Sequence, residues 1–414
     1  MSSCVVVGSG AREHALAWAI AKSADVIVTP GNPGIAAHGI MCVDTRATEL
    51  DADLFVIGPE QPLVEGLADE LRAQGKVVVG PGGVGARLEG SKAFMKEFLS
   101  ASGVPTAAYG SFHDPADAIG YLRTMSAPYV IKTDGLAAGK GVLVTNNFDE
   151  ARDDVRDKLS GASFGSAGTC IVIEEALDGV ECSVTVLCDG TNVLALTSAQ
   201  DFKRVGDDDK GANTGGMGAY APMDAMSAEQ MHEVMTTILG PTLNELTKRS
   251  IDFRGVLYAG VMLSSTGPKL LEYNVRFGDP ETEVLTPLYG DRLFGLLLKV
   301  GEGRLDVTTA PTSGCAVTVV LASYGYPATS RHGDVIHGLG DDGQLEQPVE
   351  GVLIFHAGTK RNPEGKFETG GGRVLAVTAV APSVPEARRR AYEAASLITF
   401  EGKVMRTDIA RGVG

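Results

Sequence analysis

The clearest sign of chemistry in this chain is a polar alternation past its midpoint. In LLEYNVRFGDPETE, Glu272, Asn274 and Arg276 are expected on one face of a strand, since successive strand side chains alternate. A carboxylate and an amide two residues apart suit Mg²⁺, or Mn²⁺ in its place, because Mg²⁺ usually takes its remaining ligands from water and substrate phosphates. Arg276 could clamp a carboxylate by a bidentate fork. A solvent-facing polar strand is the alternative, which the following Gly-Asp-Pro-Glu turn disfavours.

A polar loop precedes that strand. QDFKRVGDDDKGANTGGMGAY concentrates acids, cations, an amide and glycines within 21 residues, which favours a ligand site over a plain surface loop. Its candidate site residues are Asp201, Lys203, Arg204, Asn213, Thr214, Gly215, Gly216 and Met217.

A glycine-rich hairpin, GLAAGKG, is not a Walker A loop. That loop needs four residues between its glycines and a hydroxyl residue after the lysine, whereas here there are three and Gly141 follows Lys140. What remains is Lys132 in the predicted strand YVIK, and a hairpin carrying Gly139, Lys140 and Gly141. Lysine charges and free backbone N–H groups could still cradle phosphates, although an ordinary solvated hairpin would look the same.

Two further motifs are weaker. VVVGSGAREHA reads as a strand, a turn and a helix start, and Gly10 would let the backbone approach an anion. Glu13 stands where the dinucleotide fingerprint needs its third glycine, so a phosphate or small-ligand turn is favoured. IVIEEALDGVE places Glu174 and Glu175 at the end of a buried strand, where a carboxylate could accept from an exocyclic amine. A surface acidic turn is the alternative.

The elements that must position these groups read as an α/β protein. Short apolar runs at 4–7, 26–28, 54–57 and 77–79 alternate with helical stretches, which predicts a parallel sheet covered on both faces. A helix is expected from Ser91, its cap, to Gly103, its stop.

Length and pattern predict three domains within 414 residues. They are an N-terminal parallel α/β domain (1–102), a two-lobed unit (103–308) with a lid near 115–185, and a small C-terminal α/β domain (309–414).

Composition excludes several classes of protein. The chain carries 36 basic and 52 acidic residues, a balance of −16, so neither a nucleic-acid surface nor an anionic-membrane surface is expected. The start MSSCVVVGSG lacks a cationic signal-peptide region, and the longest uncharged stretch, 307–330, is broken by prolines and glycines. These features predict a soluble, cytoplasmic protein. No histidine pair in the pattern H-x-x-x-H or H-E-x-x-H, which would suggest a zinc site, occurs in the sequence.

Taken together, the motifs resemble those of the phosphoribosylamine–glycine ligase family, ATP-grasp enzymes of purine biosynthesis. GSGAREHALAW, GPEQPLVEGLAD, LEGSKAFMKEFL, VIKTDGLAAGKGV, IVIEEALDGVECS, QDFKRVG, NTGGMGAYAP, LEYNVRFGDPETE and HAGTK occur in the family's order across nearly the whole chain. The pairing of NTGGMGAY with RFGDPE is highly specific. The departures are Ala11 for glycine, Phe202 for histidine, Lys210 and Ala212 for threonine and proline, and Glu283 for glutamine.

The resemblance implies that ATP, glycine and 5-phosphoribosylamine give glycinamide ribonucleotide, ADP and phosphate through glycyl phosphate. It places Mg²⁺ or Mn²⁺ on Glu272 and Asn274, and names Arg276, Lys140 and Asp201 as catalytic. The implied nucleotide-binding residues are Lys92, Lys132, Gly139, Gly141, Glu174, Glu175, Leu177 and Glu181. The implied substrate-binding residues are Gly10, Glu13, Pro59, Glu60, Lys203, Arg204, Asn213, Thr214, Gly215, Gly216, Met217, Gly278 and Asp279.

Three other functions remain open at this stage. The first is another ATP-grasp carboxylate–amine ligase or carboxylase, the second a nicotinamide-dependent oxidoreductase, and the third a non-catalytic nucleotide-binding module. Only small-molecule partners are expected, with the chain a monomer or a weak homodimer.

Overall fold

The computed structural model describes residues 2–136, 141–161, 169–307, 310 and 312–414, and every structural statement below concerns these residues. The predicted Gly139 and Lys140 lie outside them.

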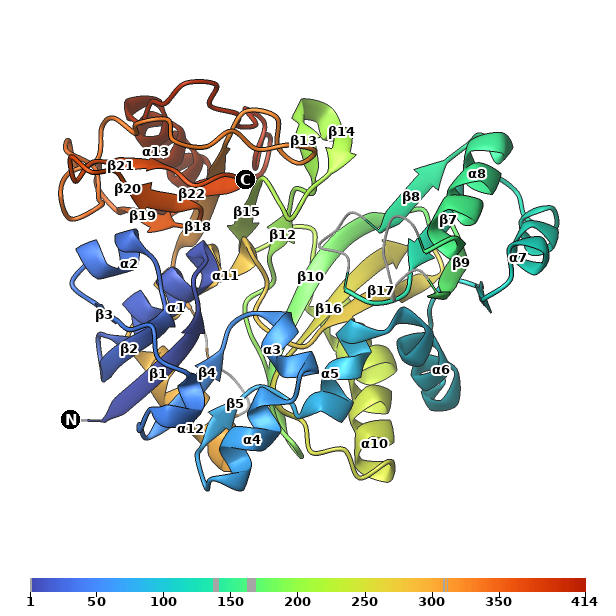
Figure 1. Cartoon of the computed structure of the whole chain (residues 1–414). Coiled ribbons are helices and arrows are strands. Elements are labelled where there is room, and N and C mark those ends of the chain that lie inside the picture. Colours follow the sequence, from blue (N-terminus) through green and yellow to red (C-terminus); the bar gives the residue numbers. More distant parts are fainter. Residues whose placement is uncertain (1, 137–140, 162–168, 308–309, 311) are drawn as a thin grey trace.

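A five-stranded parallel sheet forms the first domain (Figure 1). Its strand order is β3 (Met41–Cys42), β2 (Asp25–Pro30), β1 (Ser3–Gly8), β4 (Leu54–Ile57) and β5 (Val78–Val79). Its helices are α1 (Ala11–Ile20), α2 (Pro33–Ala37), α3 (Glu60–Val64), α4 (Leu67–Ala73) and α5 (Gly83–Gly90). Val5 and Val7 enter one hydrophobic core while Cys4 and Val6 enter another, so both faces are buried, as the uninterrupted apolar runs predict.

The helix α6 (Lys92–Ser102) leads out of this domain with the predicted ends. The Ser91 hydroxyl accepts a hydrogen bond from the Phe94 N–H at 3.1 Å, and Gly103 ends the helix with a left-handed φ of +70°.

The region that the sequence predicts as a lid folds as a four-stranded antiparallel sheet that stands apart at one side of the molecule (Figure 1). Its strands, in order, are β6 (Tyr109–Phe112), β9 (Ile171–Glu175), β7 (Tyr129–Thr133) and β8 (Val142–Thr145), covered by α7 (Pro115–Leu122) and α8 (Phe148–Leu159). Its small core, which includes Ile131, Ile171 and Ile173, is separate from the main cores.

The central sheet is antiparallel and carries the predicted metal strand. Its order is β11 (Val193–Ala195), β10 (Val180–Asp189), β16 (Arg254–Ser264) and β17 (Gly267–Asn274). Gly260 pairs with Glu272 and Val261 with Leu270, so the register shifts just before Glu272. Such a bulge re-aims the side chains that follow it. Helices α9 (Ala228–Val234) and α10 (Gly240–Lys248), joined by a π-helical turn (Met235–Leu239), precede β16.

The third sheet joins two parts of the chain. Its order is β12 (Gln200–Asp201), β15 (Gly218–Ala221), β18 (Cys315–Ala322), β22 (Arg373–Ala381) and β19 (Val352–His356), with α13 (Val384–Leu397) packed on β18 and β22. The polar loop around 201–221 therefore begins and ends on the C-terminal sheet, with the hairpin β13 (Arg204–Gly206) and β14 (Lys210–Asn213) between. A second small hairpin pairs β20 (Thr359–Arg361) with β21 (Phe367–Thr369).

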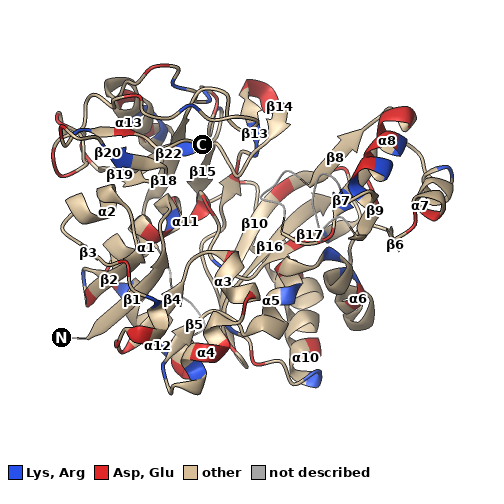
Figure 2. Ribbon diagram, viewed as in Figure 1, with Lys and Arg blue, Asp and Glu red and all other residues tan. Residues whose placement is uncertain are grey.

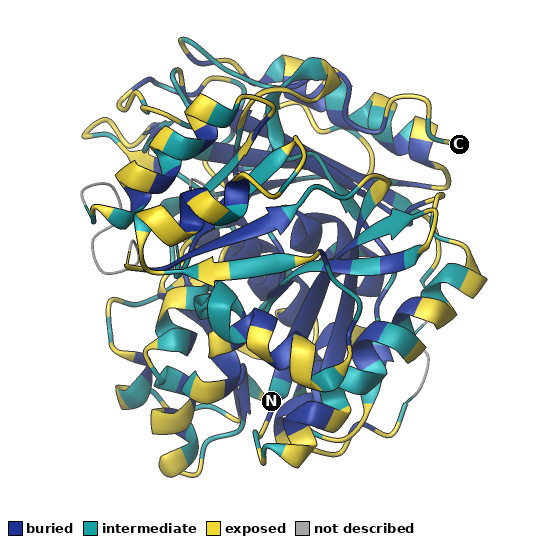
Figure 3. Ribbon diagram, turned by 90° about the vertical axis from the view of Figure 1, so that its right-hand side faces the viewer, coloured by how far each residue is buried: buried dark blue, intermediate teal, exposed yellow. Residues whose placement is uncertain are grey.

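Helices α11 (Glu281–Tyr289) and α12 (Arg292–Glu302) return from the central sheet to the other domains. Helix α11 packs against α1 and the C-terminal sheet, and α12 against β5, β10 and β16. Buried residues line the inner faces of the sheets, while the helices turn exposed residues outward (Figure 3). Acidic and basic residues are interspersed over these outer helices (Figure 2). None of the described helices is long and apolar enough to cross a bilayer.

Candidate active site

A cavity of about 660 Å³ opens where the N-terminal domain, the lid, the central sheet and the C-terminal domain meet. The predicted residues that line it are Lys92, Lys132, Gly141, Glu174, Glu175, Leu177, Glu181, Asp201, Lys203, Asn213, Thr214, Gly215, Glu60, Glu272, Asn274, Arg276, Gly278 and Asp279. Residues more than 200 positions apart in the chain are thus gathered around one space, as a single composite site requires.

Six predicted site residues do not line this cavity, namely Gly10, Glu13, Pro59, Arg204, Gly216 and Met217. The Glu13 carboxylate fills the first turn, accepting a hydrogen bond from the Gly10 N–H at 2.6 Å. A Cβ at Gly8 would lie 2.5 Å from Glu13, so this glycine makes room for the glutamate. Arg204 donates instead to the Gly211 carbonyl within its own hairpin.

The pair Glu272 and Asn274 fits a hard divalent cation. Within the described chain the Glu272 carboxylate accepts no hydrogen bond, so its oxygens are available as ligands, and both residues face the cavity. Burial disfavours the charged form of the Glu272 carboxylate. The positive charges around it, led by Lys203 and Lys132, outweigh the effect of burial and hold the pKa of Glu272 below its ordinary value. The Asn274 amide oxygen accepts one hydrogen bond, from Arg276 at 3.1 Å, which leaves its second lone pair.

Two lysines hold Glu174 in the lid-side wall of the cavity. Its Oε2 lies 2.9 Å from Lys132 Nζ on β7, and its Oε1 lies 3.2 Å from Lys96 Nζ on α6. Both oxygens of this buried carboxylate are therefore ion-paired. Burial lowers the pKa of Lys96 to about 8, with Glu174 opposing the shift. Lys96 belongs to the motif LEGSKAFMKEFL, but its position in a predicted helix does not predict a contact with Glu174.

Asp201, Lys203 and Glu181 form a second charged cluster in the cavity wall. The Lys203 ammonium is ion-paired with Glu181, and lies 3.9 Å from Asp201 Oδ2. Burial raises the pKa of Asp201 to about 8, with Lys203 opposing the shift and Glu281 adding to it. The buried Glu281 carboxylate accepts a hydrogen bond from the Tyr258 hydroxyl at 2.8 Å. It is a second acidic group close enough to act on Asp201.

Arg276 is held by two carboxylates at the N-terminal side of the cavity. Its Nη2 lies 2.7 Å from Glu89 Oε1 and its Nε lies 3.4 Å from Glu60 Oε2. The Glu89 carboxylate also accepts from the Val275 N–H at 2.8 Å, so it fixes the backbone as well as the guanidinium. Glu89 lies at the end of α5, and its position in the chain gave no reason to expect a partner 187 residues away.

The C-terminal domain supplies a further part of the wall that the sequence did not suggest. Arg373 on β22 donates to the Gly215 carbonyl at 2.6 Å and lies 3.1 Å from Asp279 Oδ1. The Tyr326 hydroxyl accepts from the Gly215 N–H at 3.1 Å. Together they hold the loop that follows Asn213 against the turn that contains Asp279.

Comparison with known proteins decides the family. Models of phosphoribosylglycinamide synthetase match three consecutive stretches, with the N domain over residues 2–89, the ATP-grasp (A) domain over 90–282 and the C domain over 316–412. A phosphoribosylamine–glycine ligase of Brucella melitensis is 46% identical and covers 98% of this chain and 96% of its own length. The chain belongs to the phosphoribosylamine–glycine ligase family. It is therefore a ligase of the ATP-grasp class, which uses ATP.

Other relatives agree. A phosphoribosylamine–glycine ligase of Vibrio vulnificus is 45% identical over 98% of this chain and 97% of its own. The crystal structure of phosphoribosylamine–glycine ligase from Thermotoga maritima superposes with a TM-score of 0.87 at 35% identity, covering 99% of this chain and all of that one. A biotin carboxylase domain of Hydrogenobacter thermophilus is 16% identical, with a TM-score of 0.72 over 98% and 91% of the two chains, and shares the fold alone.

Proposed function

We propose that this chain joins glycine to 5-phosphoribosylamine at the expense of ATP, through glycyl phosphate, giving glycinamide ribonucleotide, ADP and phosphate. The observation that carries this proposal is the composition of one cavity. It combines a hard-cation pair (Glu272 and Asn274), a cationic phosphate side (Lys92 and Lys132) and an arginine beside them, Arg276. Carboxylase chemistry on the same fold is disfavoured because the carboxylase neighbours share only the fold with this chain.

The nucleotide is assigned to the lid side of the cavity. Lys92 and Lys132 would contact its phosphates, and the backbone at Glu175 and Leu177 would read the adenine edge. Glu174, whose carboxylate lies beside Lys132 and Lys96, is assigned to the exocyclic amine of adenine. Glu181 is assigned to the ribose.

Mg²⁺ or Mn²⁺ is assigned to Glu272 and Asn274, where it would neutralise charge on the nucleotide phosphates. Arg276 would orient the glycine carboxylate by its planar fork, for attack on the γ-phosphorus. Positioning and charge neutralisation are the main demands of such a step, because the carboxylate and the phosphate repel each other. Glycyl phosphate and ADP result.

The second step is assigned to the wall formed by Asp201 and Lys203. The amine nitrogen of phosphoribosylamine attacks the carbonyl carbon of glycyl phosphate, and the C–O bond to phosphate breaks. Phosphate leaves with the electron pair, and the nitrogen gives up one proton as the amide forms. Asp201, whose pKa burial raises to about 8, is mostly protonated at pH 7 and becomes available to accept that proton as the pH rises towards 8.

Phosphoribosylamine is assigned to the end of the cavity lined by Glu60, Asn213, Thr214, Gly215 and Asp279. Glycyl phosphate hydrolyses readily, so the site must exclude water. The glycine-rich hairpin after β7 is proposed as the lid, although its Gly139 and Lys140 lie outside the described residues. We also propose domain limits at 102/103 and 308/309, a lid near 115–185, and a monomeric or weakly dimeric state.

An ADP-release assay with phosphoribosylamine made in situ from ribose 5-phosphate and ammonia tests the function. Omitting glycine, phosphoribosylamine or Mg²⁺ in turn should each abolish ADP release. Release that continues without glycine, or that needs bicarbonate in its place, would contradict the proposal and favour the carboxylase alternative.

A further inference from the structure

The hairpin β13–β14 lies between the two parts of the polar loop and lacks a core of its own. It pairs at Arg204 with Asn213 and at Gly206 with Lys210, and none of the residues in its tip (Asp207–Asp209) is buried. Asp208 and Asp209 both have left-handed backbone conformations, with φ of +54° and +52°, which are uncommon for residues other than glycine, although aspartate adopts them more readily than most. An isolated two-stranded hairpin is marginal in water, so contacts from outside must hold it.

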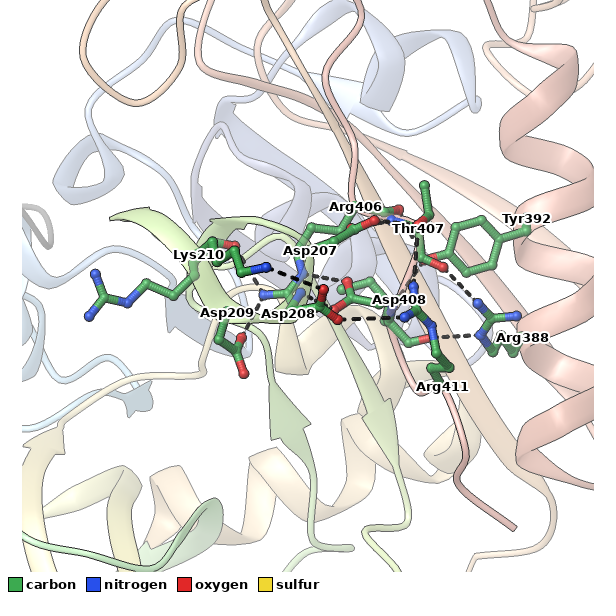
Figure 4. Close-up of polar contacts among 12 residues, drawn as sticks. Asp207, Asp208, Asp209, Lys210, Arg388, Tyr392, Arg406, Thr407, Asp408 and Arg411 are labelled. Atoms are coloured by element: carbon green, nitrogen blue, oxygen red, sulfur yellow. Dashed lines mark hydrogen bonds and ion pairs between the residues drawn. The ribbon is translucent and has the colours of Figure 1, made fainter.

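The final segment of the chain, residues 406–411, provides those contacts (Figure 4). The Asp207 carboxylate accepts from the Thr407 N–H at 2.7 Å, and the Asp208 N–H donates to Asp408 Oδ2 at 2.8 Å. Asp209 Oδ1 lies 2.7 Å from Arg406 Nη1. Each residue of the hairpin tip therefore has a partner in the final segment.

Helix α13 fixes the final segment independently of the hairpin (Figure 4). Arg388 donates to the Thr407 carbonyl at 2.7 Å and to the Ile409 carbonyl at 2.9 Å. The Tyr392 hydroxyl donates to the Arg406 carbonyl at 3.0 Å. The C-terminal domain thus presents a rigid surface to which the hairpin is attached.

Arg406 is the buried centre of this attachment, with a side chain only 1% exposed. Its guanidinium forms a fork on Asp408, with distances of 2.7 and 2.6 Å, and Nη1 donates to the Arg204 carbonyl at 3.1 Å. Its guanidinium carbon lies 5.0 Å from the centre of the Phe202 ring, within cation–π range. Arg406 therefore contacts Phe202 and Arg204, the two residues that flank Lys203 in the chain.

Lys203 links the segment 202–204 to two parts of the cavity wall. Its ammonium reaches Glu181 and Asp201, as described above. Its carbonyl accepts from both the N–H and the hydroxyl of Thr214, each at 2.8 Å, in the loop that lines the cavity. A shift of the segment 202–204, which joins β12 to β13, would move both the Lys203 ammonium and this loop.

We propose that Arg406, which does not itself line the cavity, is a positioning residue for the ligation. It holds the segment 202–204 so that Lys203 meets Asp201 and the loop after Asn213 keeps its shape at the phosphoribosylamine end. The proposal rests on the assignment of that end made above. It also gives the C-terminal segment a part in catalysis, through contacts 200 residues apart in the chain.

Steady-state kinetics of Arg406→Lys and Asp209→Asn test this proposal. Lysine keeps the charge but loses the fork and the stacking, and Asp209→Asn weakens only the attachment of the hairpin while the Asp408 fork stays. Both should raise the KM for phosphoribosylamine at least fivefold while the KM for ATP stays within twofold. Arg389→Gln, at an exposed arginine whose ion pairs with Glu386 and Glu393 stay within α13, is the control and should leave both constants unchanged. Thermal melting of each variant checks that it folds.

Unchanged KM for phosphoribosylamine in both folded variants would overturn the proposal, and so would equal increases in the KM of all three substrates. If Arg406→Lys fails to fold, Asp209→Asn decides alone, because its carboxylate is largely exposed. The variant Asn213→Ala distinguishes the assignment of the phosphoribosylamine site from the positioning role of Arg406. If it raises the KM for phosphoribosylamine and the Arg406 and Asp209 variants do not, only the positioning role is wrong. If it has no effect, the substrate assignment is wrong and the positioning proposal falls with it.

Discussion

At the scale of single residues, Glu272 is the most decisive position. Glu272→Gln keeps the size of the side chain but removes the charge that a divalent cation needs, so turnover should fall by about 100-fold or more. The variant should still fold, with a somewhat lower melting temperature, because the folded state stabilises the charged carboxylate through the surrounding cations. The ADP-release assay measures the loss, and Glu346→Gln at an exposed position is the control. Near-normal kcat would remove Glu272 from the metal site.

Arg276 makes a second prediction at this scale. Arg276→Lys should raise the KM for glycine about tenfold, since an ammonium cannot form the planar fork that a carboxylate accepts from guanidinium. The KM for ATP should change little. Arg249→Lys, which alters an ion pair remote from the cavity, controls for the loss of a guanidinium. An unaltered KM for glycine would show that Arg276 serves only to hold Glu89 and Glu60.

At the scale of elements, the loop after Asn213 depends on one glycine. Gly216 has a φ of +111°, and a Cβ there would lie 2.3 Å from Pro280 Cδ. Gly216→Ala should therefore displace this loop from the turn containing Asp279 and lower kcat/KM for phosphoribosylamine at least tenfold. Gly75→Ala is the matched control, because Gly75 has a φ of +79° with open space around it. It should cost about 1 kcal/mol of stability and leave activity intact. Equal activity in the Gly216→Ala and Gly75→Ala variants would contradict this role of Gly216.

At the scale of the whole molecule, three histidines join the first and last domains. The His356 N–H donates to His14 Nδ1 at 2.9 Å, and His14 Nε2 lies 3.1 Å from His38 Nδ1. Burial lowers the pKa of His14 and of His38, and lowers that of His356 to about 4. All three are therefore neutral in the folded protein at pH 7.

These histidines predict a loss of stability in acid. The unfolded chain takes up protons near pH 6.5 and the folded chain only at lower pH, so the stabilisation is present above pH 6.5 and is lost as pH falls towards 4. The shift at His356 alone corresponds to about 3 kcal/mol. The melting temperature should fall between pH 7.5 and 5.5, and fall less in His14→Asn, whose Oδ1 can still accept from the His356 N–H. His232→Asn, at an exposed position, should follow the parent. Parallel curves for all three proteins would exclude the histidine cluster as the cause.

Local patterns predicted much of the fold and part of the cavity. The buried strands of the first sheet and the ends of α6 follow from apolar runs, a serine cap and a glycine stop, which act within a few residues. The alternation of Glu272 and Asn274 placed both on the cavity face for the same reason. Arg373, Tyr326 and Glu89 had no local signal, because what makes them part of the wall is a partner in another domain.

The sequence by itself determined the family and the domain types, and it predicted Glu272 and Asn274 as a metal pair, since motif identity and strand alternation are properties of neighbouring residues. Only the tertiary structure decided that β12 and β15 join the C-terminal sheet, that Glu13 fills the first turn, and that Arg406 reaches the strand beside Lys203. Hydrogen bonds and ion pairs depend on distances of about 3 Å between groups. Between residues 200 positions apart, those distances are set by the packing of whole domains.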